Sequence, residues 1–236
     1  MIDYELLTSE CEKIGVNLGQ YGADRFDTYA ERLVRWNEHV NLTAITEPYD
    51  VVIKHFIDSL YICKYVKFED GQTLADIGTG AGFPGMPLLI ANPKLEVNFI
   101  DSSGKRINFI NDVLSKIGII ANTTHERAED VGKMPEYREQ YDFATARAVA
   151  PLNVLCEYCL PLVKVGGMFV SLKGSNGMEE LEGAKNAIST LGGELVTAES
   201  YELPNGDGRT IFVIKKISQT PTKYPRKPKK IDTHPL

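Results

Sequence analysis

Apolar residues recur at helical spacing along the first part of the chain. Phe26, Tyr29 and Leu33 are separated by three and four residues, so they lie on one face of a helix. A second helical stretch begins near Pro48, because proline is well tolerated in the first turn of a helix. Residues 1–70 are therefore predicted to form an N-terminal helical extension.

Beyond that extension, short apolar runs alternate with amphipathic stretches. The runs expected to form strands are 73–77, 96–100, 119–123, 141–145 and 168–172, and the helical stretches between them lie near 84–92, 104–117, 150–164 and 177–191. Strands that alternate with helices are typical of α/β proteins with a doubly wound, mostly parallel sheet. We therefore expect residues 71–216 to form one Rossmann-like domain around such a sheet.

The end of this domain has a different pattern. Two strand-like runs, 194–202 and 209–216, flank the turn-forming segment Pro204–Gly208, which predicts an antiparallel hairpin that closes the sheet. After Lys216 the chain is rich in proline and lysine and contains few apolar residues. Such a segment cannot bury enough apolar surface to fold by itself, so residues 217–236 are predicted to be a basic, disordered tail.

The net charge of −6 is unevenly distributed. Residues 215–236 hold seven basic residues and a single acid, Asp232, a sum of +6, and the rest of the chain carries −12. An acidic body with a basic tail indicates a polyanionic partner, because phosphate groups are bound largely through lysine and arginine. An ordinary solvated terminus is the alternative that the composition leaves open.

The composition argues against several classes of protein. Four cysteines are too few and too scattered for a disulfide framework, and the pair Cys156 and Cys159 lacks the further ligands of a zinc site. No apolar run approaches the ~20 residues needed to span a bilayer. The first residues lack the basic and apolar regions of a signal peptide. We therefore expect a cytoplasmic protein without a bound metal or a membrane anchor, and we expect a monomer.

The most informative motif is a glycine-rich loop between a predicted strand and a predicted helix. It reads Asp76-Ile77-Gly78-Thr79-Gly80-Ala81-Gly82. Glycines allow a ligand to lie directly against the backbone. A dinucleotide-binding loop would be spaced G-x-G-x-x-G, and a carboxylate at Asp76 would repel the pyrophosphate that such a loop holds. Asp76 instead suits a ligand with a cationic amino-acid end, such as S-adenosylmethionine.

A second acid, Asp101, closes the next predicted strand. A carboxylate at this position can accept hydrogen bonds from both ribose hydroxyls of a nucleoside. The glycine loop, Asp76 and Asp101 together favour an S-adenosylmethionine site over a structural turn or an NAD-dependent oxidoreductase site. A nucleotide-binding module without catalytic activity is the remaining alternative from another class.

Four segments taken together point to one family. They are Trp36-Asn37-x-x-x-Asn41-Leu42-Thr43, His55-x-x-Asp58-Ser59, the glycine loop continued to Pro84-Gly85, and Asp101-Ser102-x-x-Lys105-Arg106. From about Trp36 to Lys216 the chain closely resembles the bacterial small-subunit ribosomal RNA guanine-N7 methyltransferases, the family of glucose-inhibited division protein B. Generic methyltransferases share the glycine loop but not the Asn-Leu-Thr and His-x-x-Asp-Ser segments.

The resemblance implies a class I S-adenosylmethionine methyltransferase that modifies N7 of one guanine in small-subunit ribosomal RNA. Together with the loop, it implies the cofactor-binding residues Asp76, Gly78, Gly80, Phe83, Asp101, Ala128, Glu129 and Arg147. It also implies the catalytic or substrate-binding residues Asn41, His55, Arg127, Arg147 and Arg209. Structural roles stay open for three of them, because Asn41 can end a helix, His55 can be a core residue, and Arg127 can pair with Glu126 or Glu129.

The chemistry of guanine agrees with this implication. N7 has an exposed lone pair and no proton, so its attack on a sulfonium methyl group needs alignment rather than a general base. The segment around Arg147 lacks the Asp/Asn-Pro-Pro-Tyr pattern of exocyclic amino methyltransferases. Arginine reads guanine well, but a hydrogen bond to N7 would block its lone pair, so Arg147 is expected to contact O6 or phosphate. A methyltransferase for another RNA, a protein or a small molecule is the alternative activity.

Overall fold

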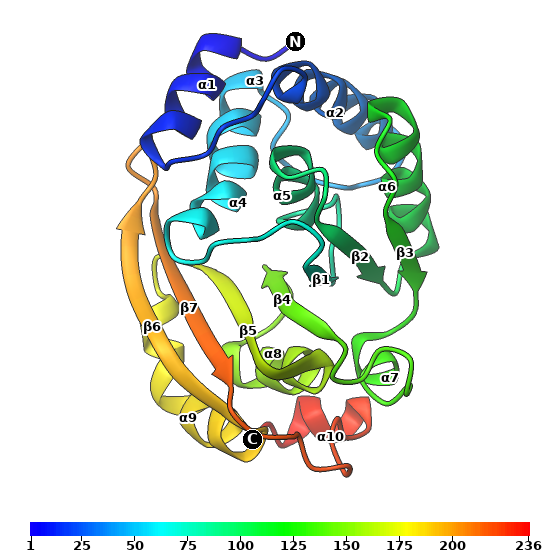
Figure 1. Ribbon diagram of the computed structural model, residues 1–236, viewed down its shortest axis with the longest axis vertical. Coiled ribbons are helices and arrows are strands. Elements are labelled where there is room, and N and C mark those ends of the chain that lie inside the picture. The colour runs from blue at the N-terminus through cyan, green and yellow to red at the C-terminus, as the bar shows by residue number, and fades with distance from the viewer.

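Seven strands form one sheet at the centre of the molecule. The computed structural model describes residues 1–236, and the strand order across the sheet is β3-β2-β1-β4-β5-β7-β6 (Figure 1). The strands are β1 (Thr73–Ile77), β2 (Glu96–Asp101), β3 (Asn122–His125), β4 (Tyr141–Arg147), β5 (Val163–Gly174), β6 (Gly193–Glu202) and β7 (Gly208–Lys216). Strands β1 to β5 pair in parallel, and β7 runs antiparallel to both β5 and β6. The predicted α/β fold, with a mostly parallel sheet closed by an antiparallel hairpin, is confirmed.

Two observed strands begin three or more residues from the predicted start, and the other five begin within one residue of it. Strand β3 begins at Asn122, three residues later than expected, because Gly118 ends the preceding helix in the left-handed conformation, with φ of +66°. Strand β5 begins at Val163, five residues earlier than expected, and its pairing with β4 is irregular between Tyr141 and Phe143.

Helices cover both faces of the sheet (Figure 1). The N-terminal helices pack on one face of the sheet together with α5 and α6. Helices α7, α8, α9 and α10 pack on the other face. The helices are α1 (Tyr4–Lys13), α2 (Gly22–Asn37), α3 (Pro48–Asp50), the π-helix η1 (Val51–Ile57), α4 (Asp58–Leu60), α5 (Gly85–Ala91), α6 (Gly104–Ile117), α7 (Ala128–Val131), α8 (Leu152–Cys159), α9 (Leu181–Thr190) and α10 (Pro228–Thr233), with short 3₁₀ turns at η2 (Tyr61–Lys64), η3 (Leu160–Leu162) and η4 (Gly177–Glu180). The carboxyl ends of the parallel strands emerge between these two layers.

The N-terminal helices share one hydrophobic core with the sheet. The predicted apolar stripe on α2, formed by Phe26, Tyr29 and Leu33, is fully buried. Burial of each such side chain stabilises the fold by about 1.5–3 kcal/mol. Tyr29 stacks on Phe56 of η1, with ring centroids 5.4 Å apart, and its hydroxyl donates a hydrogen bond to the carbonyl of Ala81. The helical extension therefore supports the glycine loop directly.

The C-terminal tail folds onto the domain, so the prediction of disorder for residues 217–236 is wrong. Helix α10 packs against α8, and its residue Ile231 is fully buried. Arg226 pairs with Glu157 of α8, with 2.6 Å between Nη2 and Oε2. Composition alone predicted disorder because the tail has few apolar residues. A buried carboxylate such as Glu157 needs a cationic partner, and the tail supplies it.

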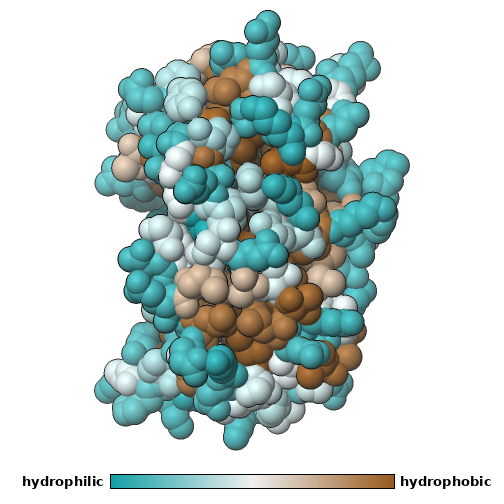
Figure 2. Space-filling model, turned by 90° about the vertical axis from the view of Figure 1, so that its left-hand side faces the viewer, coloured by the Kyte–Doolittle hydropathy of each residue, from teal (hydrophilic) through white to brown (hydrophobic).

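Strand β6 forms one edge of the sheet, and Figure 2 shows the side of the molecule on which it lies. Hydrophilic side chains dominate the upper part of this view, and apolar side chains gather in the lower part. Val196 of β6 contributes to the exposed apolar surface of the protein. No helix of the protein is both long and apolar enough to cross a lipid bilayer.

Candidate active site

The glycine-rich loop joins β1 to α5 and cannot hold side chains at two of its glycines. Gly78 has a φ of +61°, and a Cβ atom there would lie 2.6 Å from Cγ2 of Val149. Gly82 has a φ of +96°, and a Cβ atom there would lie 2.9 Å from the hydroxyl oxygen of Tyr29. Residues with side chains rarely adopt such φ values. The loop therefore presents backbone without a side chain at these positions, and Gly78 forms part of the wall of a cleft.

Asp76 does not lie where the sequence analysis expected it. Its side chain is fully buried beneath the loop and lines no cavity of the site. Oδ2 accepts hydrogen bonds from the hydroxyl of Thr79 at 2.5 Å and the N–H of Gly85 at 3.1 Å, and Oδ1 accepts one from Thr145 at 3.2 Å. Burial outweighs these bonds and raises the pKa of Asp76 to about 6. The prediction that Asp76 contacts a cofactor directly is therefore corrected, because its carboxylate supports the glycine loop from below.

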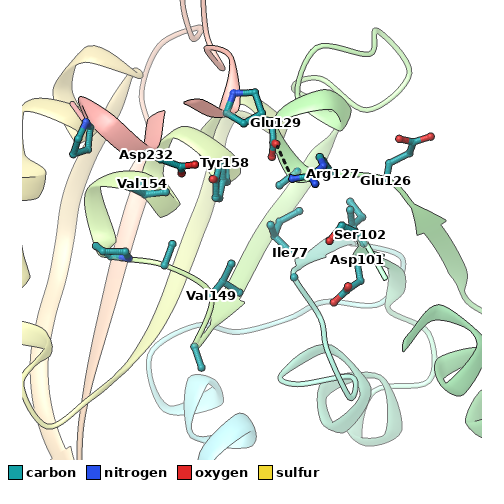
Figure 3. Close-up of a pocket in the computed structure, with 18 of the residues that line it drawn as sticks. Ile77, Asp101, Ser102, Glu126, Arg127, Glu129, Val149, Val154, Tyr158 and Asp232 are labelled. Atoms are coloured by element: carbon teal, nitrogen blue, oxygen red, sulfur yellow. Dashed lines mark ion pairs between the residues drawn. The ribbon is translucent and has the colours of Figure 1, made fainter. Parts of the chain in front are cut away.

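A cleft of about 660 Å³ opens at the carboxyl ends of the strands. It lies where the strand order reverses between β1 and β4, which is the usual position of ligands in open α/β sheets. Ile77 ends β1, Asp101 ends β2 and Val149 follows β4, so three strands contribute to its wall (Figure 3). Its volume falls within the range of small-molecule sites. We call this cleft the first cavity.

Asp101 lines the first cavity and ties it to the glycine loop. Oδ2 accepts a hydrogen bond from the N–H of Gly80 at 2.9 Å, and Oδ1 accepts one from the N–H of Ser103 at 2.8 Å. Nη1 of Arg106 lies 3.5 Å from Oδ2. A carboxylate offers about four acceptor positions, so these three donors leave one position free, and the long contact with the half-exposed Arg106 can be replaced by a second hydroxyl group. Asp101 is therefore oriented and still able to accept hydrogen bonds from a diol.

The segment after β3 supplies another part of the first cavity. Arg127, at the N-cap of α7, lines it together with Ala128 and Glu129 (Figure 3). Glu129 is 5% exposed, and its Oε1 lies 3.8 Å from Nη1 of Arg127, whose side chain is largely exposed. The pairing of Arg127 with Glu129, which the sequence left open, is therefore present. Because this long contact leaves most acceptor positions of Glu129 free, its carboxylate can accept a hydrogen bond from a ligand.

A second cavity of about 460 Å³ adjoins the first and is lined mainly by polar and charged residues. Its charged and titratable residues are Lys54, His55, Asp58, Arg147, Lys173, Glu180 and Arg209. Ala148 lines both cavities and has a φ of +57°, a strained value for a residue with a side chain. Strain of this kind is concentrated at functional sites. The two cavities therefore meet at Ala148, directly after Arg147.

Asp58 joins the two arginines of the second cavity. Oδ2 accepts a hydrogen bond from Nη1 of Arg147 at 2.9 Å, and Oδ1 accepts one from Nε of Arg209 at 3.1 Å. The guanidinium of Arg147 also lies over the ring of Phe83, with Cζ 4.6 Å from its centroid. Arg147 and Arg209 were predicted site residues, whereas Asp58 was not. The sequence could have indicated Asp58 as a site residue, because it belongs to the His-x-x-Asp-Ser segment.

His55 is held as a neutral, oriented side chain. It belongs to the π-helix η1, an irregularity that is frequent at functional sites, and its ring stacks on Phe83 with centroids 4.3 Å apart. Nη2 of Arg147, which can only donate, lies 3.3 Å from Nδ1, so Nδ1 is the acceptor. Nε2 then carries the proton and donates it to the hydroxyl oxygen of Thr43 at 2.9 Å. Burial, followed by the charge of Arg147, lowers the pKa of His55 to about 3.

Four predicted residues line neither cavity, namely Asp76, Gly80, Phe83 and Asn41. Asn41 is exposed on the loop that follows α2. Its neighbour Asn37 orders that loop instead, because Oδ1 of Asn37 accepts hydrogen bonds from the N–H groups of Leu42 at 2.8 Å and Thr43 at 3.0 Å. Phe83 is buried and supports the second cavity through its contacts with the histidine and arginine described above. The structure therefore brings together the other predicted residues but leaves Asn41 apart.

Lys173 and Glu180 form an ion pair beside the strained turn after β4. Nζ of Lys173 lies 2.8 Å from Oε2 of Glu180 and donates a hydrogen bond to the carbonyl of Ala150 at 2.6 Å. The carboxylate of Glu180 also accepts a hydrogen bond from the N–H of Leu152 at 2.5 Å. These bonds hold the turn that separates the two cavities. Neither residue was predicted, because a lysine on a strand and a glutamate in a later turn form no local pattern.

Fold and site together define a class of protein. A bare glycine loop after β1, an acid at the end of β2 and an adjoining polar cavity beside β4 are the arrangement of a class I methyltransferase. The sequence profile of the GidB family, described as rRNA small subunit methyltransferase G, matches residues 23–206. The chain therefore belongs to this family.

Similar proteins agree with this assignment. The chain is 50% identical over 230 residues to the ribosomal RNA small subunit methyltransferase G of Bacillus licheniformis, with 96% of each chain covered. It is 47% identical over 234 residues to the protein of the same name from Acetivibrio thermocellus, with 98% of this chain and 96% of the relative covered. A solved structure of a mutant 16S rRNA (adenine(1408)-N(1))-methyltransferase from Catenulisporales acidiphilia has a TM-score of 0.54 and 14% identity, covering 67% of this chain and 88% of that one. At that identity the likeness concerns the fold alone.

Proposed function

We propose that this chain transfers the methyl group of S-adenosylmethionine to N7 of a guanine in small-subunit ribosomal RNA. The observation that carries the proposal is the meeting of two cavities at Ala148. The first has the features of a nucleoside site, and the second holds arginines but no free general base. The names of the relatives from Bacillus licheniformis and Acetivibrio thermocellus support the class of RNA.

The residues of the first cavity fit S-adenosylmethionine. The backbone at Gly78 leaves space that a Cβ atom would fill, Asp101 has lone pairs for the ribose hydroxyls, and Glu129 can accept a hydrogen bond from the adenine amino group. When bound, the cofactor supplies an electrophilic methyl group on a sulfonium centre. These three residues bind and orient it, and none of them exchanges a proton with it.

The second cavity suits a base whose nucleophilic atom carries no proton. His55 is neutral and fully hydrogen-bonded, and Asp58 is engaged by Arg147 and Arg209. Exocyclic amino groups and ribose hydroxyls must lose a proton when they are methylated, whereas guanine N7 does not. The remaining donors of the two arginines can bind O6 or a phosphate oxygen. The chain therefore acts by alignment and electrostatics.

A chain with a net negative charge needs local positive surface to bind RNA. Among the basic residues of the C-terminal segment, Arg226 is held in an ion pair, but Lys223, Lys227, Lys229 and Lys230 are exposed. The helix α10, which carries two of these lysines, borders the first cavity. We infer that the exposed lysines bind phosphates near the methylated guanine. A ribosomal substrate also implies a cytoplasmic location, and the proposed acting unit is a monomer.

Labelled S-adenosylmethionine tests this function. The protein is incubated with the labelled cofactor and intact small ribosomal subunits, naked small-subunit RNA, or bulk protein. We expect label in the RNA, and chain scission at a single guanine after mild reduction and aniline treatment, because N7 methylation weakens the imidazole ring and the glycosidic bond. Label in protein, in a ribose, in a pyrimidine or on an exocyclic nitrogen would contradict the proposal. An Arg147→Ala variant with wild-type folding is expected to lose this activity.

A further inference from the structure

The C-terminal segment, residues 217–236, is held on the domain by a buried ion pair. Glu157 of α8 is fully buried, and the guanidinium of Arg226 donates to both of its oxygens, at 2.9 Å from Nε to Oε1 and 2.6 Å from Nη2 to Oε2. The backbone N–H of Arg226 donates to Oε1 at 2.7 Å. A bidentate pair fixes direction as well as distance, and a buried carboxylate without its partner is strongly destabilising. The segment therefore has one defined position on α8.

A second group of contacts holds the segment just before this ion pair. Arg138 donates a hydrogen bond from Nη2 to the carbonyl of Thr220 at 2.7 Å and another from Nη1 to the carbonyl of Tyr224 at 2.8 Å. Pro225 packs closely on Gly132, where an added Cβ atom would lie 2.9 Å from the proline ring. The chain is thus attached on both sides of Pro225 before it enters α10.

This attachment brings the end of the chain to the first cavity. Pro228, Asp232 and Pro235 line that cavity together with Asp101. Figure 3 shows Asp232 of α10 beside Tyr158 of α8, across the cavity from Asp101. The family profile ends at residue 206, so none of these C-terminal residues belongs to the matched region.

The chemistry of this wall fits an adenine ring. If Asp101 holds the ribose, the base occupies the part of the cavity around Glu129, Tyr158 and Asp232 (Figure 3). Carboxylates can accept hydrogen bonds from the exocyclic amino group of adenine, and proline rings offer apolar surface to the purine. Burial, followed by the charges of Glu129 and Asp232, raises the pKa of Tyr158 to about 12, so its hydroxyl stays protonated at neutral pH.

We propose that the C-terminal segment is part of the cofactor site, where α10 closes the first cavity over the adenine of S-adenosylmethionine and raises the affinity for it. The identity of the ligand rests on the proposed function. Binding free energies are reciprocal, so a segment that stabilises the bound cofactor is itself stabilised by the cofactor. The proposal therefore has two consequences that can be measured separately, one for affinity and one for the protection of α10.

Calorimetric titration with S-adenosylmethionine tests the affinity. A chain that ends at Lys227 keeps the Arg226–Glu157 pair, so the buried carboxylate stays satisfied, but it lacks α10 with Pro228 and Asp232. We expect its dissociation constant to rise about tenfold relative to the full chain. The matched control is Lys229→Ala, which changes an exposed residue of α10 outside the cavity and keeps the wild-type affinity.

The outcomes separate this proposal from the proposed function. Equal affinities of the shortened and full chains would overturn the role of α10 and leave the methyltransferase function intact. Absence of binding by the full chain would overturn the proposed function itself. Circular dichroism of the shortened chain verifies that the domain stays folded, as the retained ion pair leads us to expect.

Limited trypsin digestion of the full, unsubstituted chain tests whether the cofactor protects α10 from cleavage. Lys229 and Lys230 are exposed on α10 and provide cleavage sites. Saturating S-adenosylmethionine is expected to slow cleavage there about tenfold, because a ligand bound to the closed state reduces the population of the opened one. Lys67, which is exposed on a loop far from the cavity in sequence, serves as the internal control with an unchanged rate. Equal cleavage rates at α10 with and without the cofactor would contradict the proposal.

Discussion

The carboxylate of Asp58 lies 2.9 Å from the guanidinium of Arg147, which follows it by 89 residues in the chain. Asp58 belongs to the N-terminal helices, and Arg147 ends β4. The same carboxylate accepts a hydrogen bond from Arg209 of β7, so a single acid positions both arginines of the second cavity. This carboxylate is 4% exposed, which makes the contact only weakly screened by solvent.

Asp58→Asn is expected to reduce methyl transfer about 100-fold, because small misplacements of positioning groups cost that much in rate. The amide keeps the shape of the carboxylate but offers only one oxygen, so it cannot accept from Arg147 and Arg209 at the two original positions. The affinity for S-adenosylmethionine should not change, since Asp58 does not line the first cavity. Single-turnover methylation of small ribosomal subunits and calorimetry measure the two effects separately.

Asp207→Asn is the matched control for that variant. Asp207 is more exposed, and its carboxylate lies 3.8 Å from Nη2 of Arg209. Exposed pairs of this kind contribute at most about 1 kcal/mol, so the control is expected to keep a rate close to that of the wild type. Equal rates for the two variants would show that groups other than Asp58 hold the arginines in place.

The lowered pKa of His55 predicts that the stability of the fold decreases as the pH falls. Its pKa in the folded chain is about 3, below the ordinary value of 6.5. Between these values the unfolded chain binds a proton that the folded chain does not, so the free energy of unfolding falls as the pH falls, by about 1.4 kcal/mol per pH unit. Above pH 6.5 this contribution is fully present and constant. His55→Gln should remove it, as urea unfolding at several pH values would measure.

The shifted pKa of Asp76 changes the free energy of unfolding with pH in the opposite direction. Burial raises its pKa from 3.8 to about 6, so its contribution is fully present below pH 3.8 and is lost as the pH rises through 6. Between pH 3.8 and about 6, the effects of His55 and Asp76 on the free energy of unfolding change with pH in opposite directions and offset each other in the wild type. In His55→Gln only the slope of Asp76 remains, and its stability relative to the wild type should increase as the pH falls below 6.5. The exposed His39→Gln control should follow the wild type, and a parallel pH profile for both variants would contradict the prediction.

Gly78→Ala is expected to weaken S-adenosylmethionine binding by about tenfold or more, measured by calorimetry. The new methyl group would lie 2.6 Å from Cγ2 of Val149, and the loop would have to move. Gly71→Ala is a matched control, because Gly71 also has a positive φ, +77°, but no atom within 4 Å of an added Cβ. Both variants should lose about 1–2 kcal/mol of stability from backbone strain, and only Gly78→Ala should lose affinity. Adding Val149→Ala to Gly78→Ala should restore part of the binding.

The exposed lysines of the C-terminal segment predict a salt dependence of RNA binding. We replace Lys223, Lys227, Lys229 and Lys230 by glutamine. The slope of the log–log plot of affinity against salt concentration is then expected to become less steep, by roughly 0.7–0.9 for each lost phosphate contact. Affinity for S-adenosylmethionine should stay unchanged. Filter binding of small-subunit RNA over a salt series measures the slopes. A variant with Lys67, Lys94 and Lys185 replaced is the control, and if both variants kept the wild-type slope, the segment would touch no phosphate.

Much of the fold could be predicted because its signals are local. The stripe of Phe26, Tyr29 and Leu33 must be buried on some partner wherever the helix packs, and alternating strands and helices allow few topologies. The start of β3 lies three residues later than predicted, because the apolar run Ile119-Ile120-Ala121 after the helix C-cap Gly118 belongs to the connecting loop. The place of the first cavity was predictable for the same reason, since Gly78 and Asp101 lie at the carboxyl ends of neighbouring parallel strands, which meet at one edge of the sheet.

The direction of individual side chains was not predictable in this way. A carboxylate next to a glycine loop can point outward to a ligand or inward to the backbone, and the sequence does not distinguish the two for Asp76. The packing decides it, because Thr79, Gly85 and Thr145 all donate to that carboxylate beneath the loop. Asp58 was missed because its two partners come from strands far along the chain.

The sequence by itself determined the class of fold, the family and the place of the glycine loop, because residue spacing and backbone freedom are properties of short segments. Only the tertiary structure decided which charges meet. Glu157 and Arg226 are separated by 69 residues, and neither predicts the other by position. Their pairing turns a tail of disordered composition into a wall of the first cavity, because a carboxylate buried by the packing of α8 is stable only with a cation beside it.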